Sequence, residues 1–433
     1  MTYGIDLGTT NSLVGTYGNL YNALVPSIVD MDSKVAGESQ RTNYKTLRGF
    51  KTSMNSDQGG LEAIVASSYV LSELKRVGNV TDNSDVVISV PAYFNNSQRA
   101  ATIKAANIAK LNVVALINEP TAAAMAISEG SVGTSIVFDL GGGTFDISVI
   151  ESNATTYHVL ATDGCILGGN NFDDALLTML ANKSNLSWRL MGDNKARDTV
   201  CKAKIKMQNL LNNKQPVEVY FEDYDVKTLL TYDGYIECMK SVFGKALTLT
   251  QSVISESKVN VSNCNFYFVG GSTRCPFLRE WIEKELGITA APITYNPDRI
   301  VAEGACYYAK LIDEGCAVKV LEDVSKQIGF AINGEILDII VPRNSRLPFT
   351  GVTTHIADYE RSVKEFDISF YQGDSILKSE CECLGTIHFE FTEEKAPGFS
   401  VFDVEVHEDI NGKLTISCSE ILQEPHTITL EVL

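Results

Sequence analysis

The sequence predicts an α/β region followed by an all-β region, and three observations support this fold class. Up to about residue 310, apolar runs rich in β-branched residues alternate with amphipathic stretches of helical spacing. From about Ile328 onward, only short strand-like runs separated by turn residues remain. One strand–turn–strand pattern also occurs twice within the first region. Since 433 residues exceed one ordinary hydrophobic core, we expect two or three domains.

The repeated pattern begins close to the N-terminus. YGIDLGTTNSLV (residues 3–14) and VFDLGGGTFDISV (residues 137–149) each contain an apolar strand, an Asp-Leu-Gly turn, small residues and a second apolar strand. The two copies lie 133 residues apart. Two matching hairpins at this separation predict two related lobes that face each other.

Helices and buried strands follow the first copy. Apolar residues between Leu61 and Val77 recur at helical spacing, which predicts an amphipathic helix. DVVISV (residues 85–90) predicts a strand, and the alanine-rich stretch from Ser97 to Lys110 predicts a helix. Further along, NFYFVGG predicts a strand that leads through glycines into a helix beginning near Pro276.

The last part of the chain shows only strand patterns. Asn333-Gly334 and Asn411-Gly412 are dipeptides that favour type I′ hairpin turns, because both central residues of that turn need positive φ. The pattern therefore predicts an antiparallel sandwich. The predicted strands are GEILDIIV (334–341), EFDISFY (365–371), TIHFEF (386–391), VFDVEV (401–406), KLTISCS (413–419) and HTITLEV (426–432).

Charge and composition exclude some classes of partner. The net charge is −18, and from Ala317 onward 9 basic residues stand against 21 acidic ones. This balance argues against nucleic acid, whose phosphates recruit Lys and Arg. We see no signal peptide and no apolar run of the ~18 residues that span a membrane.

The ten cysteines show no metal-binding spacing, so we expect reduced thiols in a cytoplasmic protein. A redox pair formed by Cys381 and Cys383 is the alternative to reduced core thiols.

The two repeated turns suit a nucleoside triphosphate with a metal ion. Glycine in a tight turn lets backbone N–H groups approach a phosphate closely. Asp6 and Asp139 end their strands just before the turns, where one or two carboxylates suffice for Mg²⁺. Ordinary hairpins with solvated aspartates are the alternative, and no Walker-type sequence is present. The first turn comprises Gly8, Thr9, Thr10 and Asn11, and the second comprises Gly141, Gly142, Gly143 and Thr144.

A third glycine turn follows the strand NFYFVGG. It consists of Gly270, Gly271, Ser272, Thr273 and Arg274, and a helix follows it. Such a turn could pack against adenine and ribose, with the guanidinium of Arg274 stacked on the base. A strand–Gly–helix junction of purely structural purpose is the alternative, because such junctions are common.

Seven collinear motifs resemble the seventy-kilodalton heat-shock chaperones of the DnaK type. The resemblance covers almost the whole chain, and it implies an actin-like (ribonuclease H-like) ATPase domain of two lobes followed by an all-β sandwich. It implies an ATPase domain at 1–317, a linker at 318–326 and a peptide-binding sandwich at 327–433. The motifs are IDLGTTNS, VPAYFNNSQRAAT, INEPTAAAMA, FDLGGGTFDIS, LGGNNFD, VGGSTRCP and NPDRIVAEGA.

The resemblance also implies catalytic roles. Lys45, in NYKTLRGF, matches the family lysine that steadies the γ-phosphate and the attacking water, since a fixed cation stabilises developing phosphoryl charge. A surface lysine on a short basic stretch is the alternative. Glu119 and Asp146 would orient the water, and Thr144 would lie beside the γ-phosphate. Glu119 could instead cap the helix that Pro120 begins.

Binding roles follow from the same resemblance. Asp6 and Asp139 would hold Mg²⁺ through water, with ATP or ADP in the cleft between the lobes. Pro91 and Arg99 resemble the family's relay toward the peptide-binding domain. The other nucleotide contacts would be Gly8, Thr9, Thr10, Asn11, Gly141, Gly142, Gly143, Gly168, Lys204, Gly270, Gly271, Ser272, Arg274 and Asp298.

Some positions depart from the family pattern. Cys201 stands where the family usually has a glutamate for the ribose, and Gln208 stands where it has a serine. The segment KVLEDVS (319–325) lacks the family's run of leucines, and Ala115 replaces a basic residue that the linker would contact. These departures predict altered nucleoside affinity and weaker coupling between the domains.

The resulting prediction is a slow ATPase that binds extended hydrophobic polypeptide segments, without a helical lid. A J-domain co-chaperone and a nucleotide exchange factor are the expected protein partners, whereas nucleic acid and membranes are not expected. Three alternatives stay open: a phosphotransferase on the same fold, a filament-forming actin-like protein, and a regulator that binds nucleotide without turnover.

Overall fold

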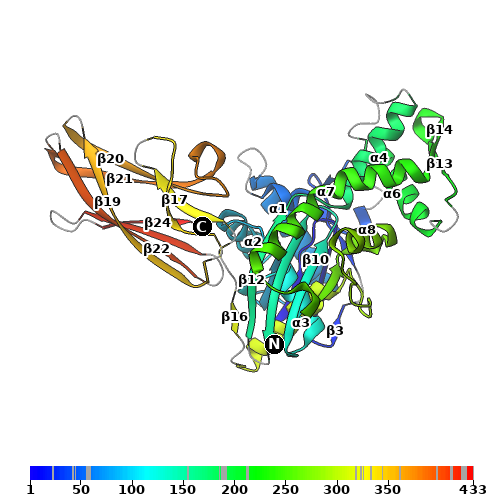
Figure 1. Cartoon of the computed structure of the whole chain (residues 1–433), viewed down its shortest axis with the longest axis horizontal. Helices are drawn as coiled ribbons and strands as arrows, with labels where there is room; N and C mark the ends of the chain where they lie inside the picture. Colours follow the sequence, from blue (N-terminus) through cyan, green and yellow to red (C-terminus); the bar gives the residue numbers. More distant parts are fainter. Residues whose placement is uncertain are drawn as a thin grey trace.

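The computed structural model shows a mixed α/β body joined to a β-rich extension (Figure 1). In Figure 1 the β-rich part lies at the left in yellow to red, and a helical arm with a small hairpin projects at the upper right. The structure describes residues 1–21, 24–40, 43, 45–54, 60–153, 156–184, 186, 193–210, 214–316, 319–321, 324, 326–331, 334–343, 345–359, 362–395, 398–409, 413–420 and 427–432.

The first sheet is built around the N-terminal hairpin. β1 and β2 pair antiparallel, with Asp6 opposite Leu13, and β8 lies parallel to β1 on its other side. The buried residues Val86, Val87 and Ile88 of β8 explain its apolar sequence, because a parallel strand covered on both faces has no solvent side. In spatial order its strands are β3 (Asn19–Leu20), β2 (Asn11–Thr16), β1 (Tyr3–Asp6), β8 (Asp85–Val90) and β9 (Asn112–Asn118), with β4 (Val25–Pro26) paired to β2.

The second sheet repeats this connectivity. β10 and β11 pair antiparallel, with Asp139 opposite Asp146, and β15 lies parallel to β10. Each sheet therefore has a three-stranded antiparallel meander with a parallel strand beside its first member. The predicted repeat of two hairpins is confirmed at this level. In spatial order the strands are β15 (Cys264–Val269), β10 (Gly133–Leu140), β11 (Phe145–Asn153), β12 (Thr156–Cys165) and β16 (Lys319–Leu321).

Helices cover these sheets, and local sequence signals define their ends. Asn95 caps α2 through a capping box with Gln98, and Pro120 stands in the first turn of α3, whose N-cap is Asn118 rather than Glu119. The predicted helices over 61–77, 97–110 and from Pro276 are confirmed. The helices of the described chain are α1 (Gly60–Val77), α2 (Asn96–Ile108), α3 (Glu119–Ser128), α4 (Gly169–Lys183), α6 (Asn194–Asn209), α7 (Tyr232–Ser257), α8 (Pro276–Leu286) and α9 (Ile300–Asp313).

Two of these helices cross at backbone distance. A Cβ at Gly304 of α9 would lie 1.8 Å from the carbonyl oxygen of Ala122 in α3. α9 also packs on the first sheet, where a Cβ at Gly4 of β1 would lie 2.2 Å from the backbone nitrogen of Cys306. α3 packs on β10 and β11 of the second sheet, so the crossing of α3 and α9 joins the two sheets.

Smaller elements complete the body. The hairpin of β13 (Val217–Phe221) and β14 (Val226–Leu230) packs with α4 and α6 to form the projecting arm in Figure 1. A short sheet of β5 (Ile28–Asp30), β6 (Val35–Ala36) and β7 (Leu47–Arg48) flanks α1. No helix in the described part of the chain is both long and apolar enough to cross a membrane.

The β-rich part contains two four-stranded antiparallel sheets over one hydrophobic core, and we call it the sandwich. Phe330, Phe370 and Phe402 are buried in this core. Five of the six strands predicted from the sequence are confirmed, and GEILDIIV is a strand only over Asp338–Val341, because Gly334 and Glu335 form a bend before it. Asn333 and Asn411-Gly412 lie outside the described residues. One sheet has β18 (Asp338–Val341), β17 (Gln327–Ala331), β20 (Val363–Gly373) and β21 (Glu382–Lys395); the other has β19 (Phe349–Tyr359), β22 (Gly398–Glu408), β23 (Leu414–Glu420) and β24 (Thr427–Val432).

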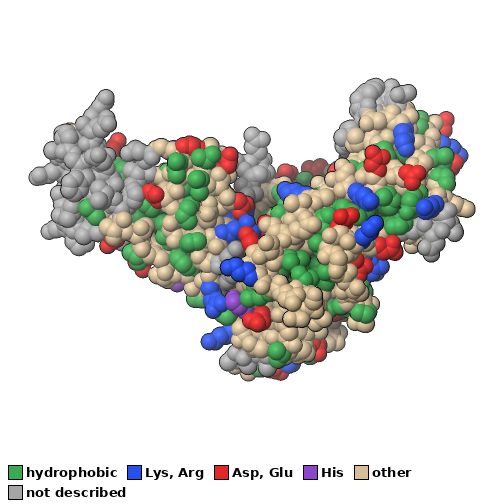
Figure 2. Space-filling model, viewed as in Figure 1, with side chains coloured by type: hydrophobic (Ala, Val, Ile, Leu, Met, Phe, Trp, Pro, Cys, Tyr) green, Lys and Arg blue, Asp and Glu red, His purple; other side chains and the backbone are tan. Residues whose placement is uncertain are grey.

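The sandwich contacts the α/β body through polar groups. The guanidinium of Arg343 donates to the carbonyl of Thr162 at 2.9 Å and pairs with Asp163 at 3.1 Å, and Arg346 lies 2.7 Å from His158. Figure 2 shows basic side chains along this boundary. Part of the segment expected to link the two regions, Lys319–Leu321, forms the edge strand β16 beside β12.

Candidate active site

A cavity of about 340 Å³ lies where the strand ends of the two large sheets meet. The first and second turns, the third glycine turn and helices α4 and α6 all contribute to its walls. The sequence-predicted residues that line it are Asp6, Gly8, Thr9, Thr10, Asn11, Glu119, Asp139, Gly141, Gly142, Thr144, Lys204, Gly270, Gly271, Ser272, Arg274 and Asp298.

The first and second turns touch each other across the cavity. A Cβ at Gly142 would lie 1.8 Å from the hydroxyl of Thr10, and a Cβ at Gly143 would lie 2.5 Å from a methyl carbon of Thr9. Gly168 closes the contact from behind, because its Cβ would lie 2.5 Å from the backbone of Gly142. Glycine is therefore needed for space at these positions, and bare backbone faces the cavity.

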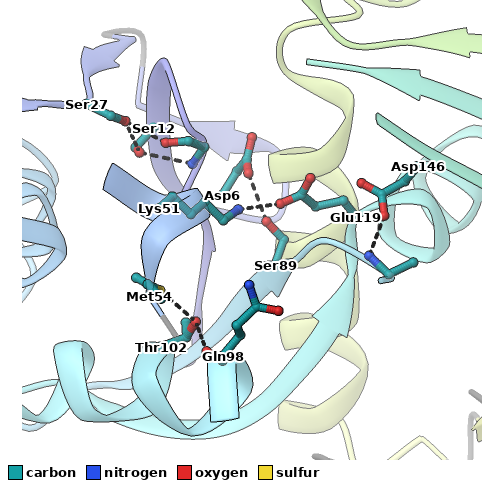
Figure 3. A network of polar contacts seen from close by, with 12 residues as sticks. Asp6, Ser12, Ser27, Lys51, Met54, Ser89, Gln98, Thr102, Glu119 and Asp146 are labelled. Atoms are coloured by element: carbon teal, nitrogen blue, oxygen red, sulfur yellow. Dashed lines mark hydrogen bonds and ion pairs between the residues drawn. The ribbon is translucent and has the colours of Figure 1, made fainter. Parts of the chain in front are cut away.

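Internal hydrogen bonds hold the first turn in shape. The backbone N–H of Gly8 donates to the hydroxyl of Ser12 at 3.1 Å, and the hydroxyl of Ser27 donates to the carbonyl of Gly8 at 2.6 Å (Figure 3). In the second turn, the N–H of Gly141 donates to the carbonyl of Thr144 at 3.0 Å. The hydroxyl of Thr9, by contrast, is buried without a hydrogen-bond partner among the described residues.

A buried ion pair lies beneath the turns. Lys51 Nζ donates to Glu119 Oε1 at 2.6 Å, and both side chains are almost completely buried (Figure 3). Ser89 donates to the carboxylate of Asp6 at 2.8 Å. Lys51 comes from the short 3-10 helix η2 (Phe50–Ser53), whose neighbouring residue Phe50 is buried and anchors it.

Four carboxyl groups lie within electrostatic reach of this ammonium group. Burial, followed by the charge of Glu119, raises the pKa of Asp6 to about 7 and raises the pKa of Asp139 well above its ordinary value. The same two causes raise the pKa of Asp146, although its carboxylate accepts hydrogen bonds from the backbone N–H groups of Ala92 and Tyr93. The positive charge of Lys51 lowers all three pKa values, but by less than burial and Glu119 raise them. The site therefore has more carboxyl groups than this ammonium group can neutralise.

The structure places Lys45 away from the site. Its side chain is exposed at the surface, it does not line the cavity, and its backbone N–H donates to Asn43. Lys51, six residues later in the same basic stretch, takes the buried position at Glu119. The sequence interpretation missed Lys51 because two lysines flank Arg48 without any pattern that distinguishes them. Phe50 and the left-handed Gly49 before it are the local signals of an inward-facing turn.

The other end of the cavity is more open. Arg274 is half exposed, and its guanidinium pairs with Asp298 at 2.6 Å and donates to Asn296 at 2.6 Å. Gly270 adopts a φ of 84°, a left-handed conformation that favours glycine, and it turns the chain toward the cavity. The hydroxyl of Ser272 donates to the carbonyl of Gly141 at 2.7 Å, which links the third turn to the second.

One polar cluster at this end was not predicted in full. Lys204 pairs with the buried carboxylate of Asp173 at 2.8 Å, and Asp173 lines the cavity beside Cys201. Burial raises the pKa of the Cys201 thiol to about 11, so this side chain is a neutral thiol at pH 7. Gln208 lines the same wall and donates to the hydroxyl of Tyr235. Asp173 follows LGGNNF in the sequence. An acidic residue on the buried face of the helix that begins there was the signal that could have identified it as a site residue.

The arrangement suits a polyphosphate that carries a cation. Bare glycine backbone and the unpartnered hydroxyl of Thr9 offer donors to phosphate oxygens. The excess carboxylates offer hard oxygen ligands to a divalent cation. Among the described residues, no three His, Cys, Asp or Glu side chains converge as a ready metal-ligand cluster. A cation here would therefore share its ligands with a bound phosphate and water.

Comparison with known proteins agrees with this chemistry. A family model described as Hsp70 protein matches residues 30–431. A chaperone protein HscA homolog of Vibrio vulnificus is 30% identical over 480 residues, covering 96% of this chain and 75% of the relative. An HscA homolog of Haemophilus influenzae is 29% identical, covering 97% and 75%. Heat shock 70 kDa protein 7, chloroplastic, of Arabidopsis thaliana is 30% identical, covering 90% and 57%. The chain therefore belongs to the Hsp70 family of ATP-hydrolysing chaperones.

Proposed function

We propose that this ATP-dependent chaperone hydrolyses ATP in the cavity between its two glycine turns and uses the nucleotide state to control polypeptide binding by the sandwich. One observation carries the proposal: two turns without room for a Cβ meet above a buried lysine–carboxylate network. That combination brings backbone donors, hard oxygen ligands and a fixed cation to one point.

The proposed architecture is an actin-like ATPase domain of two lobes at 1–317, a linker at 318–326 and a peptide-binding sandwich at 327–433. The repeated connectivity of the two large sheets supports two related lobes. Separate hydrophobic cores in the sheet regions and in the sandwich support the division into units.

Phosphate binding would use the two turns. The backbone of Gly8 to Asn11 and of Gly141 to Gly143 would face the phosphate oxygens, and the hydroxyls of Thr9 and Thr144 would donate to them. Mg²⁺ would supply positive charge that offsets the phosphate charge. Asp6 and Asp139 would hold the ion through water, which suits the reluctance of Mg²⁺ to lose its hydration shell.

Lys51 would do what the sequence interpretation gave to Lys45. Its ammonium group is fixed by Glu119 at 2.6 Å and is shielded from solvent, so it needs no reorganisation as charge develops on the γ-phosphate. Glu119 and Asp146 would orient the attacking water from below. The backbone bonds to Asp146 leave one buried carboxylate oxygen without a partner among the described residues, and a water beneath the turns would donate to it.

The nucleoside would lie at the open end of the cavity. Lys204 with Asp173 would face the ribose, and the guanidinium of Arg274 would stack on the base. Cys201 offers only a weak donor where the family pattern has a glutamate. This end would therefore contribute less affinity than the phosphate end.

Extended hydrophobic polypeptides are the proposed clients of the sandwich, bound in a strand-like conformation. A J-domain co-chaperone and a nucleotide exchange factor are the proposed protein partners. A cytoplasmic location stays a prediction, since one relative is described as chloroplastic.

The first experiment separates Lys51 from Lys45. Single-turnover ATP hydrolysis should slow by about 100- to 1,000-fold in Lys51→Ala, which is the usual loss when a fixed transition-state cation is removed. Lys45→Ala is the matched control, because its side chain is exposed, and its rate should stay within about twofold of the wild type. Equal rates in the two variants would refute the assignment of Lys51.

The second experiment tests coupling. The dissociation rate of a fluorescent, uncharged, hydrophobic peptide is measured with Mg·ATP and with Mg·ADP. Faster release with ATP than with ADP supports control of the sandwich by the nucleotide. Identical release rates, alongside normal hydrolysis, would leave an ATPase that does not control its sandwich.

A further inference from the structure

The sandwich meets the start of α2 through a set of side-chain hydrogen bonds. The backbone N–H of Asn96 donates to Gln372 Oε1 at 3.2 Å, and Gln372 Nε2 donates back to Asn96 Oδ1 at 2.5 Å. The amide of Asn96 also donates to Glu408 Oε1 at 3.0 Å. Asn95 next to it donates to Glu382. In Figure 1 the sandwich accordingly lies against α2.

Glu408 is an unusual member of this contact. It ends β22 and is only 3% exposed, and its second carboxylate oxygen, Oε2, has no hydrogen-bond partner among the described residues. Its strand neighbours are apolar, since Phe349 of β19 and Leu414 of β23 lie opposite it. Burying a carboxylate with one unsatisfied oxygen costs free energy that the protonated acid does not incur.

Charged groups around Glu408 do not offset this cost. Arg99 of α2 attracts the carboxylate, and Asp409 after β22 repels it. The guanidinium of Arg99 is also engaged by the carbonyl of Phe94 and by Asn118. Glu382 of β21 adds a second carboxylate at the same contact, while Gln372 of β20 is neutral. Burial is the largest influence and raises the pKa of Glu408 to about 7.

The composition of the contact suits reversible opening. It consists of polar groups, and polar interfaces between regions of one chain resemble transient protein–protein interfaces. When the sandwich leaves α2, Glu408 at the strand end becomes exposed to water and its pKa returns toward the ordinary value of 4.5. A difference in pKa between two states makes the equilibrium between them depend on pH.

We propose that docking of the sandwich on α2 takes up a proton at Glu408, so that mild acidification favours the docked arrangement. This inference goes beyond the proposed ATPase cycle and rests on the contact rather than on nucleotide chemistry. The direction of the pH dependence follows because Glu408 has a higher pKa in the docked state than in the undocked state. Docking is strongest below the ordinary pKa, weakens as pH rises toward 7, and then levels off.

His158 works in the opposite direction at the second contact. Its ring nitrogen lies 2.7 Å from the guanidinium of Arg346, and burial followed by the charge of Arg346 lowers its pKa below the ordinary 6.5. A protonated His158 would repel Arg346 and weaken docking at low pH. A His158→Gln background removes this titration and keeps an acceptor for Arg346, so the contribution of Glu408 can be measured alone.

The backbone amide of Asn96 reports docking directly. As the first residue of α2, its N–H has no acceptor within the helix, and it donates to Gln372 of the sandwich. Its hydrogen-exchange protection, corrected for the intrinsic pH dependence of exchange, therefore follows the docking constant. The amide of Ile5, in the centre of the first sheet, reports global opening in the same sample.

Protection of Asn96 in the His158→Gln chain should be about tenfold higher at pH 6 than at pH 8, with or without Mg·ATP. Adding Glu408→Gln should abolish this pH dependence and hold protection at a high level, because the neutral amide replaces the protonated acid. Glu405→Gln is the matched control, since Glu405 lies exposed on the same strand, and it should behave like the parent.

Three results would overturn the proposal. They are protection that does not change with pH in the parent, the same pH dependence in Glu408→Gln as in the parent, and an unprotected Asn96 amide at every pH. A failed ATPase assay would leave the proposal intact, because the exchange measurement needs no hydrolysis.

Discussion

The two ends of the nucleotide cavity differ in how tightly they are built. At the phosphate end, the glycines of the second turn pack on the threonine side chains of the first with no room for a Cβ, and Lys51, Glu119 and Asp146 are buried beneath them. At the nucleoside end, Arg274 is half exposed and its partners are surface groups. The phosphate end therefore depends on shape that few residues can supply, whereas the nucleoside end depends on side chains that can be exchanged.

The largest effect should come from crowding the phosphate end. In Gly168→Ala, the new Cβ would lie 2.5 Å from the backbone of Gly142 and displace the second turn. We expect the affinity for Mg·ATP, measured by titration calorimetry, to fall by more than about 100-fold. Gly244→Ala is the control, because no atom lies within 4 Å of its added Cβ and alanine favours the helix α7. An affinity for Mg·ATP within tenfold of the wild type would show that the second turn can shift to accommodate the added Cβ without losing its binding geometry.

An intermediate effect should come from removing charge below the turns. Asp146→Asn keeps the acceptor for the N–H groups of Ala92 and Tyr93 and removes a buried charge. Because the pKa of Asp146 is raised, its carboxylate costs stability increasingly as pH rises above the ordinary 3.8.

The ligand-free variant should melt about 2–4 °C higher than the wild type at pH 8, as followed by calorimetry, and the difference should shrink toward pH 5. Hydrolysis should slow at the same time, since the water loses one orienting group. A variant less stable than the wild type at pH 8 would show that Lys51 already compensates the charge.

The smallest effect should come from the open end. Arg274→Ala removes a half-exposed pair with Asp298, so the melting temperature should change by less than about 1 °C. Affinity should fall by about two- to fivefold through loss of stacking on the base. The loss should be equal for ATP and ADP in titration calorimetry, because Arg274 lies away from the phosphates. A loss confined to ATP would contradict the assignment of Arg274 to the base.

The sequence indicated the glycine turns well, because their requirement is local. A turn that lacks room for a Cβ must carry glycine, and the Asp-Leu-Gly pattern displays this in a dozen residues. The helix over 61–77 and the strand over 85–90 followed from local patterns for the same reason, whereas helices α4, α6, α7 and α9 were not predicted. Choosing between Lys45 and Lys51 was different, because burial of a lysine is decided by residues far away, such as Glu119.

The strand pattern indicated that position 408 is buried, but the charge of the glutamate indicated an exposed side chain. Alternation along β22 puts Phe402, Val404 and Val406 on the buried face, and position 408 continues that face. An acidic residue at the end of such a series could be taken for a solvated one. Its burial becomes evident only once α2, from another part of the chain, lies against it.

The close crossing of α3 and α9 has a mechanical consequence for the catalytic cleft. Gly304 and Ala122 meet backbone to backbone, so at this point the two helices are as close as their main chains allow. α9 packs on the first sheet and α3 on the second, and both helices begin at the cavity, where Val301 and Glu119 line its wall. A rotation of one helix on the other would therefore move these two cavity walls relative to each other directly.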